Sequence, residues 1–143
     1  MLLDFELFDT VLAEAEKSPR GRMHFDLRTQ AFESTEVSSE DIMPWRDSSQ
    51  RMLNVLTPDT VIPIHRHPDS SETVICLRGA VEEVFFDATG QITERHELRY
   101  GGPCPGIQVP RGVYHTCRCL EPGSVIFEAK DRPYNPQLTE DLL

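Results

Sequence analysis

The first residues of the chain alternate apolar and polar side chains with the period of an α-helix. The apolar positions are Leu7, Phe8, Val11, Leu12 and Ala15. Spacings of three and four residues place them on one face of a helix. Asp4 is a suitable N-cap and Pro19 a suitable stop, so the pattern predicts one helix from about Phe5 to Lys17. We expect this helix to cover a face or edge of the remaining structure, or to form a dimer contact, and assign it no catalytic role.

Beyond about residue 50 the apolar positions form short runs, separated by turn-forming residues. Residues 87–90, Asp-Ala-Thr-Gly, predict a hairpin loop, and residues 121–123, Glu-Pro-Gly, predict a turn. The expected strands are Arg51–Leu56, Val61–His65, Glu72–Leu77, Val81–Phe86, Ile92–Leu98, Gly106–Val109, His115–Leu120 and Val125–Lys130. Many short strands punctuated by Gly and Pro are typical of a double-sheet jelly roll, so we expect an all-β fold.

The stretch from Thr29 to Ser49 is rich in Ser, Thr, Glu and Asp and has neither a helical nor a strand period. It predicts a polar loop, part of which could form a strand over the barrel or a lid. Trp45 could anchor this segment or line a pocket mouth. The expected organisation is a helix in residues 1–20 and a single barrel domain in residues 21–143, because 143 residues suit one core.

The net charge and the cysteine content limit the kinds of partner and the compartment that we expect for this protein. The net charge of -10 argues against binding to nucleic acid or to an anionic membrane, since both need clustered Lys and Arg. Acidic residues come early, at Asp4 and Glu6, which predicts no targeting segment, and no run reaches transmembrane length. The four cysteines form no C-x-x-C pair. We therefore expect reduced thiols, a cytoplasmic protein and a small-molecule ligand.

Two histidines one residue apart, His65 and His67, carry the strongest chemical signal. In a strand, side chains at i and i+2 point to the same face, so both imidazoles can aim at one point while Arg66 faces away. Turn-forming residues follow and let Glu72 return beside the histidines, and His115 arrives from a later strand. The four residues together predict a metal site.

Three neutral imidazoles and one carboxylate suit a single divalent ion of iron, manganese, nickel, cobalt or zinc. If the ion is octahedral, two positions remain open for water or substrate. An H-x-H pair alone is a weak motif, which chance surface histidines also produce. The constellation of His65, His67, Glu72 and His115 is far more specific.

These residues resemble the cupin family, whose first motif is G-x5-H-x-H-x4-E-x6-G and whose second is G-x5-P-x-G-x2-H-x3-N. The first matches at the ligands and at Gly79, and the second at Pro110, Gly112 and His115. The departures are Asp59 and Cys104 for the opening glycines and Cys119 for the closing asparagine. None of the departures is a ligand position. The resemblance implies a cupin double-stranded β-helix, a jelly-roll barrel, with a short N-terminal helix.

Further segments look like those of WbuC-type cupin-fold metalloproteins. They are Ser18-Pro19-Arg20, Gln50-Arg51-Met52-Leu53, Pro63-Ile64-His65-Arg66-His67 and the run from Phe127 to Tyr134. Asp26-Leu27-Arg28 departs from the Asn-Leu-His-like end expected for the early strand. The resemblance implies a homodimer and a metal-binding barrel that is often associated with surface-polysaccharide gene sets.

Strand alternation extends from the ligands to the pocket wall. Cys117 and Cys119 lie two and four residues after His115, and Cys76 lies four residues after Glu72, so in a strand they share a face with these ligands. Three thiols are therefore expected to point into the barrel. Cys117 could be a redox-active or metal-ligating thiol. The alternative is that these small side chains fill a narrow barrel as apolar residues, because free cysteines are commonly buried.

Four residues are candidates for catalysis around the ion. Lys130 or Arg51 could bind a substrate carboxylate or phosphate, Glu128 could orient a ligand histidine, and Tyr134 could donate to substrate. Glu128 and Lys130 share a strand face, so they could equally pair with each other or with solvent. His24 and His96 lie outside the motifs and are expected to be surface or structural residues.

Three functions remain open. The first is a metal-dependent enzyme, isomerase- or epimerase-like, that acts on a small polar metabolite such as a sugar or sugar nucleotide in surface-polysaccharide synthesis, with metal-bound hydroxide or Glu128 as base. The second is an iron-dependent dioxygenase. The third is a non-catalytic module that binds a small ligand. One fold and one ligand set support all three, so the choice depends on the residues around the ion.

Overall fold

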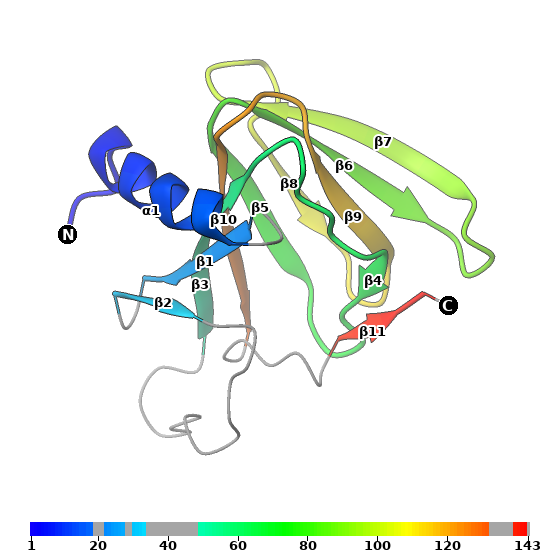
Figure 1. Ribbon diagram of the computed structural model, residues 1–143. Helices are drawn as coiled ribbons and strands as arrows, with labels where there is room; N and C mark the ends of the chain where they lie inside the picture. The colour runs from blue at the N-terminus through cyan, green and yellow to red at the C-terminus, as the bar shows by residue number, and fades with distance from the viewer. Residues whose placement is uncertain (19–21, 28–29, 34–48, 132–138, 143) are drawn as a thin grey trace.

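A computed structural model describes residues 1–18, 22–27, 30–33, 49–131 and 139–142 (Figure 1). One helix lies beside two antiparallel sheets that face each other. The elements are α1 (Phe5–Lys17), β1 (Arg22–Asp26), β2 (Ala31–Glu33), β3 (Ser49–Leu56), β4 (His65–Arg66), β5 (Glu72–Arg78), β6 (Ala80–Phe86), β7 (Ile92–Arg99), β8 (Gly106–Val109), β9 (Tyr114–Cys119), β10 (Ser124–Asp131) and β11 (Glu140–Asp141). This arrangement confirms the predicted jelly roll with a short N-terminal helix.

Strands distant in sequence are neighbours in both sheets. Within the described residues, the first sheet has the order β2-β1-β3-β10-β5-β8 and the second the order β11-β4-β9-β6-β7. The last long strand, β10, lies between β3 and β5, and β9 pairs with both β4 and β6. Pairing across long connections brings the histidines of β4 and β9 into one sheet, with β5 and β10 in the sheet that faces it.

The space between the sheets is filled by a mainly apolar core. Its buried members are Leu56, Val74, Cys76, Val81, Phe85, Leu98, Val109, Cys117 and Ile126. They alternate along their strands with residues that face outward, as a two-layer β fold requires. The cysteine parity predicted from the sequence is confirmed, because Cys76 and Cys117 are buried here and Cys119 packs against the same cluster.

The helix covers the outer face of the first sheet. Asp4 caps it by accepting the backbone N–H of Leu7 at 3.0 Å, and the helix ends at Lys17, as the sequence predicts. Its apolar face packs on β1, β3 and β10 in a second cluster of buried residues: Phe8, Val11, Ala15, Phe25, Leu53, Val55 and Val125. Strand β3 is therefore buried on both faces, which explains why its sequence lacks a simple alternation.

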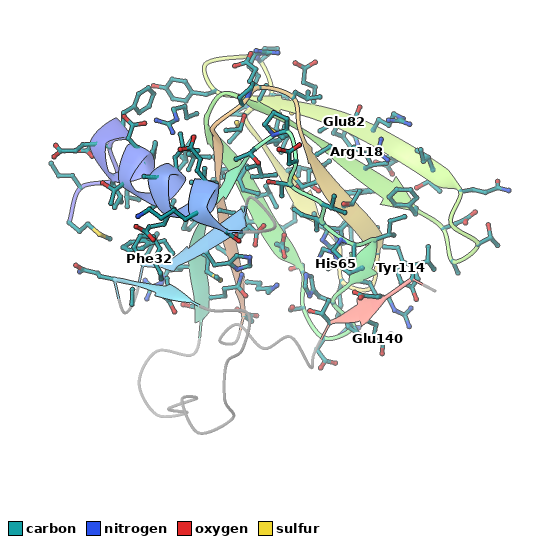
Figure 2. The ribbon with its side chains drawn as sticks, in the orientation of Figure 1. Phe32, His65, Glu82, Tyr114, Arg118 and Glu140 are labelled. Carbon is teal, nitrogen blue, oxygen red and sulfur yellow. The ribbon has the colours of Figure 1, made fainter. Side chains whose placement is uncertain are left out.

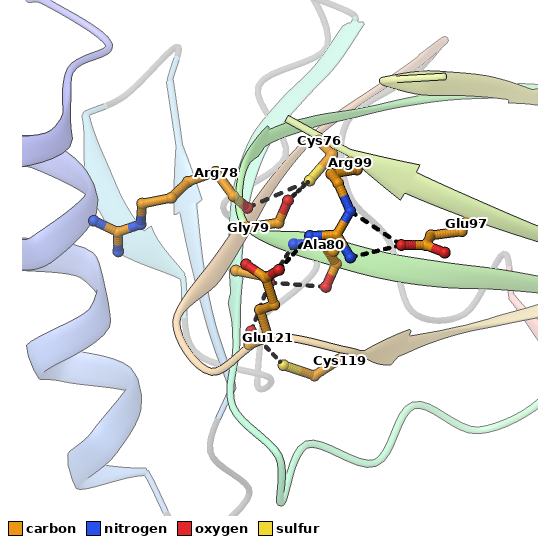
Figure 3. A network of polar contacts seen from close by, with 9 residues as sticks. Cys76, Arg78, Gly79, Ala80, Glu97, Arg99, Cys119 and Glu121 are labelled. Atoms are coloured by element: carbon orange, nitrogen blue, oxygen red, sulfur yellow. Dashed lines mark hydrogen bonds and ion pairs between the residues drawn. The ribbon is translucent and has the colours of Figure 1, made fainter. Parts of the chain in front are cut away.

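One end of the barrel is closed by a network of polar contacts around the β5–β6 turn (Figure 3). Gly79 has a φ of +72°, and Ser124 Oγ accepts the Ala80 backbone N–H at 3.0 Å. Arg99 forms ion pairs with Glu97 and Glu121 at the same end. The closing glycine of the first motif thus has a structural role, because a left-handed φ favours glycine.

Most strand predictions agree with the structure, with two exceptions. The predicted strand Val61–His65 is wrong: β4 begins only at His65. Pro63 has no N–H to donate, which explains why pairing does not extend further back. Strand β11 was not predicted. Strand β1 agrees with the early strand that the resemblance implies, and β2 lies inside the polar stretch, part of which could form a strand. Trp45 lies outside the described residues. Among the described residues, no helix is long and apolar enough to cross a membrane.

Candidate metal centre

Three histidines converge at one end of the barrel interior. His65 on β4 pairs in register with His115 on β9, and their ring centroids are 4.4 Å apart. The His67 ring lies 5.0 Å from that of His65 and 5.5 Å from that of His115. One ligand atom from each residue lies within 4.8 Å of the other two. Three imidazoles at this separation could hold one divalent ion.

Backbone carbonyls orient two of these rings. His65 Nδ1 lies 2.8 Å from the carbonyl oxygen of Pro63, and His115 Nδ1 lies 2.9 Å from that of Val113. A hydrogen bond at Nδ1 fixes the tautomer and leaves Nε2 as the free ligand atom. His115 Nε2 is buried and has no hydrogen-bond partner among the described residues. The orphaned nitrogen fits a metal ion as its missing partner.

The environment keeps both of these imidazoles neutral. Burial, reinforced by the neighbouring His115, lowers the pKa of His65 to about 3. Burial likewise lowers the pKa of His115. A neutral imidazole has the lone pair that a metal ion requires, so no proton has to be displaced from these two rings near neutral pH.

Glu72 and Lys130 lie on one side of the histidines. Glu72 Oε2 is 3.1 Å from His67 Nε2 and 3.2 Å from Lys130 Nζ, and that Nζ is also 3.2 Å from His67 Nε2. Burial alone would raise the pKa of Glu72, but the hydrogen bond with His67 and the charge of Lys130 outweigh it and lower the pKa. Glu72 therefore remains a carboxylate in a buried position beside His67, but among the described residues only the three histidines form the group whose ligand atoms all lie within 4.8 Å of one another.

The strand that carries the first histidine is held by the C-terminal strand β11 (Figure 2). Arg66 points away from the histidines, as predicted: its side chain pairs with Glu140 at 2.6 Å and stacks on Tyr114. Thr139, just before β11, places its hydroxyl 3.4 Å from His67 Nδ1. The sequence patterns did not indicate this contribution of the C-terminus to the site.

A second set of polar residues lines the inner wall beyond the histidines. Glu83 on β6 pairs in register with Cys117 on β9, and only 1% of Glu83 is exposed. Burial and the nearby Glu72 raise the pKa of Glu83 well above its usual range. Glu128 on β10 is half-buried and adds to this effect. Sequence reasoning missed Glu83, although a glutamate between the core positions Val81 and Phe85 was a usable signal.

The remaining candidates lie in different places. Lys130 is at the histidines, but Arg51 lies on the opposite face of the first sheet, beside Ala129, so the structure does not bring it to the site. Tyr134 lies outside the described residues. Burial raises the pKa of Cys117 well above its usual range, and the pKa values of Cys76 and Cys119 are also raised. Protonated thiols in a core suit the apolar alternative better than a redox or ligating role.

Sequence comparison gives one match. Residues 43–98 fit a family described as a domain of unknown function, DUF6016. This segment contains His65, His67 and Glu72 but ends before His115. No curated protein matches the chain in sequence.

Structural comparison identifies the architecture. Oxalate decarboxylase from Bacillus subtilis has a TM-score of 0.60 and 17% identity, over 84% of this chain and 32% of that one. The capsular polysaccharide assembling protein CapF from Staphylococcus aureus has a TM-score of 0.57 and 17% identity, over 67% and 29%. The chain thus spans about a third of the length of these proteins. Both have the cupin fold, and the likeness shows that this chain has it too.

Proposed function

We propose that this chain is a metal-dependent enzyme that acts on a small polar metabolite, such as a sugar or sugar nucleotide, in surface-polysaccharide synthesis. The observation that carries the proposal is Lys130, held at 3.2 Å from both Glu72 and His67 beside three convergent histidines. A buried ammonium next to a metal site is a recognition element for an anionic group of a ligand. The similarity to CapF, described as a capsular polysaccharide assembling protein, supports the sugar assignment.

The site residues have two roles: some would hold the metal ion, and others would bind the substrate or transfer its proton. His65, His67 and His115 would hold the ion, with Glu72 as the fourth ligand. When bound, a divalent ion supplies Lewis-acid polarisation of a carbonyl or hydroxyl oxygen. Lys130, which contacts Glu72 and His67, would bind the carboxylate or phosphate of the substrate. Glu128, half-buried on the same strand face, would accept or return the proton at its carboxylate oxygen.

The site also favours a ligand of negative charge. A divalent ion together with Lys130 carries more positive charge than Glu72 and Glu128 offset. Burial and the nearby Glu72 raise the pKa of Glu83 well above its usual range, which lessens the negative charge that Glu83 adds. In a closed, low-dielectric site a surplus of positive charge attracts an anion more strongly than it would in water. This expectation separates a metabolite-binding site from a purely structural metal site.

The metal content of variants tests which residues hold the ion. We expect untagged protein to carry one divalent ion per chain, and the double variant His67→Ala with His115→Ala to carry none. His96→Ala is the matched control, because His96 lies on β7 outside the cluster and should leave the stoichiometry unchanged. Full stoichiometry in the double variant would exclude the three histidines as the metal site.

Turnover tests the reaction class. Metal-loaded protein is incubated with sugars and sugar nucleotides, and isomer formation is followed by NMR; Lys130→Met should abolish conversion, whereas Lys17→Met, on the exposed face of α1, should not. Oxygen uptake by anaerobically reconstituted ferrous protein with a thiol, diketone or catechol would instead favour the dioxygenase. Binding without conversion in both assays would favour the non-catalytic module. Homodimerisation and a cytoplasmic location remain predictions, for which size-exclusion chromatography and cell fractionation are the measurements.

A further inference from the structure

The inner wall of the barrel carries buried polar side chains that the proposed metal chemistry does not use. Asn54 and Glu83 are each only 1% exposed. Among the described residues, neither the oxygen nor the nitrogen of the Asn54 amide has a hydrogen-bond partner, and Glu83 Oε2 has none. Buried polar groups are nearly always hydrogen-bonded, so two such side chains in one core need a physical explanation.

Both residues project between the two sheets. Asn54 on β3 pairs in register with Ile126 on β10, a member of the inner core, and has the same parity as the core residue Leu56. Glu83 on β6 pairs in register with Cys117, which lies two residues from His115 on the same face of β9. The two side chains therefore project into the barrel interior from opposite sheets. Glu83 lies two residues in register from the level of His115, and Asn54 lies deeper, four residues along β3 from the register partner of Lys130.

Packing alone does not account for these residue types. Leucine has the branched shape of asparagine and methionine the extended shape of glutamate, so they could fill the same core without desolvating a polar group. The outer face of β3 shows this alternative, because Leu53 and Val55 there are buried among apolar side chains. A polar partner that is absent from the free chain would satisfy both Asn54 and Glu83.

We propose that Asn54 and Glu83 form a subsite for the hydroxyl groups of a ligand whose carboxylate is bound by Lys130 and the metal centre. The inference deepens the proposed function and rests on it: the substrate class becomes a polyhydroxylated carboxylate, such as a sugar acid. A hydroxyl both donates and accepts, and so matches an amide with free donor and acceptor atoms and a carboxyl group. An aromatic or alkyl ligand would leave the same atoms unpaired.

The route to this subsite passes the partly exposed side chains of the same wall. Glu128 and Lys130 are half-buried, so solvent reaches the inner face of β10. The unpartnered atoms of Asn54 and Glu83 are closed to solvent in the free chain, so the ligand has to displace a neighbour. Met52 lies two residues before Asn54 on the inner face of β3 and pairs in register with Glu128. Its unbranched side chain can rotate aside to admit the ligand. Binding by this route is accompanied by a conformational change.

The test compares two carboxylates of the same ring size on the metal-loaded full chain by calorimetry. D-glucuronate carries hydroxyls on its six-membered ring, and cyclohexanecarboxylate carries none. We expect the wild type to bind glucuronate at least about tenfold more tightly, because cyclohexanecarboxylate leaves the buried polar atoms of Asn54 and Glu83 unpaired. Equal affinities, or no binding of glucuronate by protein that holds its metal, would overturn the proposal.

The variants separate a ligand role from a structural one. Asn54→Leu and Glu83→Met each remove an unsatisfied buried group, so we expect an unchanged or higher Tm, unchanged metal content and loss of the preference for glucuronate. Glu83→Gln should keep most of the preference, because its amide still donates and accepts. Leu56→Met is the matched control on the same face of β3, outside the entry route, and should keep it fully. A preference that survives both Asn54→Leu and Glu83→Met would overturn the subsite.

Failure of the proposed function has a different signature. Protein that holds no metal, or a Lys130→Met variant that binds both carboxylates as tightly as the wild type, would contradict the metal and lysine roles. Retained metal and a working Lys130, together with equal affinity for the two carboxylates, would contradict only the hydroxyl subsite.

Discussion

The two faces of β3 and β10 differ sharply although they belong to the same strands. The outer face places Leu53, Val55 and Val125 beneath the apolar side of α1. The inner face mixes apolar residues with Asn54 on β3 and Glu128 on β10, and amide atoms of Asn54 are buried without partners among the described residues. The outer face can be explained by stability alone, whereas the inner face carries desolvated polar groups that cost stability. This difference separates a sheet face that serves stability alone from one that serves stability and also carries the polar groups of the proposed ligand site.

The largest effect is expected on the outer face. Leu53→Ala removes a fully buried side chain under the helix and should lower the free energy of unfolding by about 2–5 kcal/mol, through lost burial and a cavity. Urea denaturation measures this change, and metal content should stay at one ion per chain. A decrease in the free energy of unfolding below about 1 kcal/mol would contradict the structural role of the outer face. A fully folded variant that has lost its metal would contradict the assignment of the metal site to the inner face alone.

Acid should act through the inner side of the barrel. In metal-free protein the folded-state pKa of His65 is about 3, below the unfolded value of 6.5, so the unfolded chain binds more protons as the pH falls through this window. The stability contributed by the neutral ring is then lost from pH 6.5 downward, by up to about 1.4 kcal/mol for each pH unit. The lowered pKa values of His115 and Glu72 act in the same direction.

Urea midpoints of metal-free protein between pH 7 and pH 4 measure this acid effect. The variant His65→Asn should show a flatter profile than the wild type, because the group responsible has been removed. Glu83 works in the opposite direction: its raised folded-state pKa means that its contribution falls as the pH rises above the unfolded value of 4.5. A His65→Asn profile as steep as that of the wild type between pH 6.5 and pH 4 would contradict the neutral state of His65 in the folded protein.

A substitution in the β5–β6 turn, which joins the two sheets, should lower the free energy of unfolding less. In Gly79→Ala, an added Cβ would lie 2.4 Å from Ser124 Oγ, at a backbone φ of +72°. The strained backbone and the displaced serine should together cost roughly 1–3 kcal/mol. Thermal unfolding measures the loss, and Gly101→Ala is the matched control, with a similar φ of +71° but nothing within 4 Å of the added Cβ. Equal losses in the two variants would assign the cost to the backbone alone.

The smallest effect is expected at the surface of the helix. Asp9 pairs with Arg78 Nη1 at 2.6 Å, but its side chain is 69% exposed, so solvent screens the attraction. Asp9→Asn should change the free energy of unfolding by no more than about 1 kcal/mol. A larger loss in urea denaturation would show that this pair, and not the apolar face of α1, holds the helix to the barrel.

Several elements could be read from local patterns. The helix Phe5–Lys17 follows from its apolar period and the Asp4 cap, and the strand Gly106–Val109 was predicted with its observed bounds. Short-range signals of this kind act within a few residues. The short β11 escaped prediction because its existence depends on its pairing with β4, a partner elsewhere in the chain. Two residues carry too little periodicity to reveal such pairing.

The sequence by itself determined the class of fold and the residues that could hold a metal, because strand alternation, turn residues and the spacing of His65, His67, Glu72 and His115 are local or short-range properties. Only the tertiary structure decided the surroundings of those ligands. Lys130 reaches Glu72 from 58 residues away, while Arg51 faces the other side of the same sheet and Glu83 enters from the opposite sheet. The register between strands distant in sequence sets these positions, and register emerges from the packing of the whole barrel.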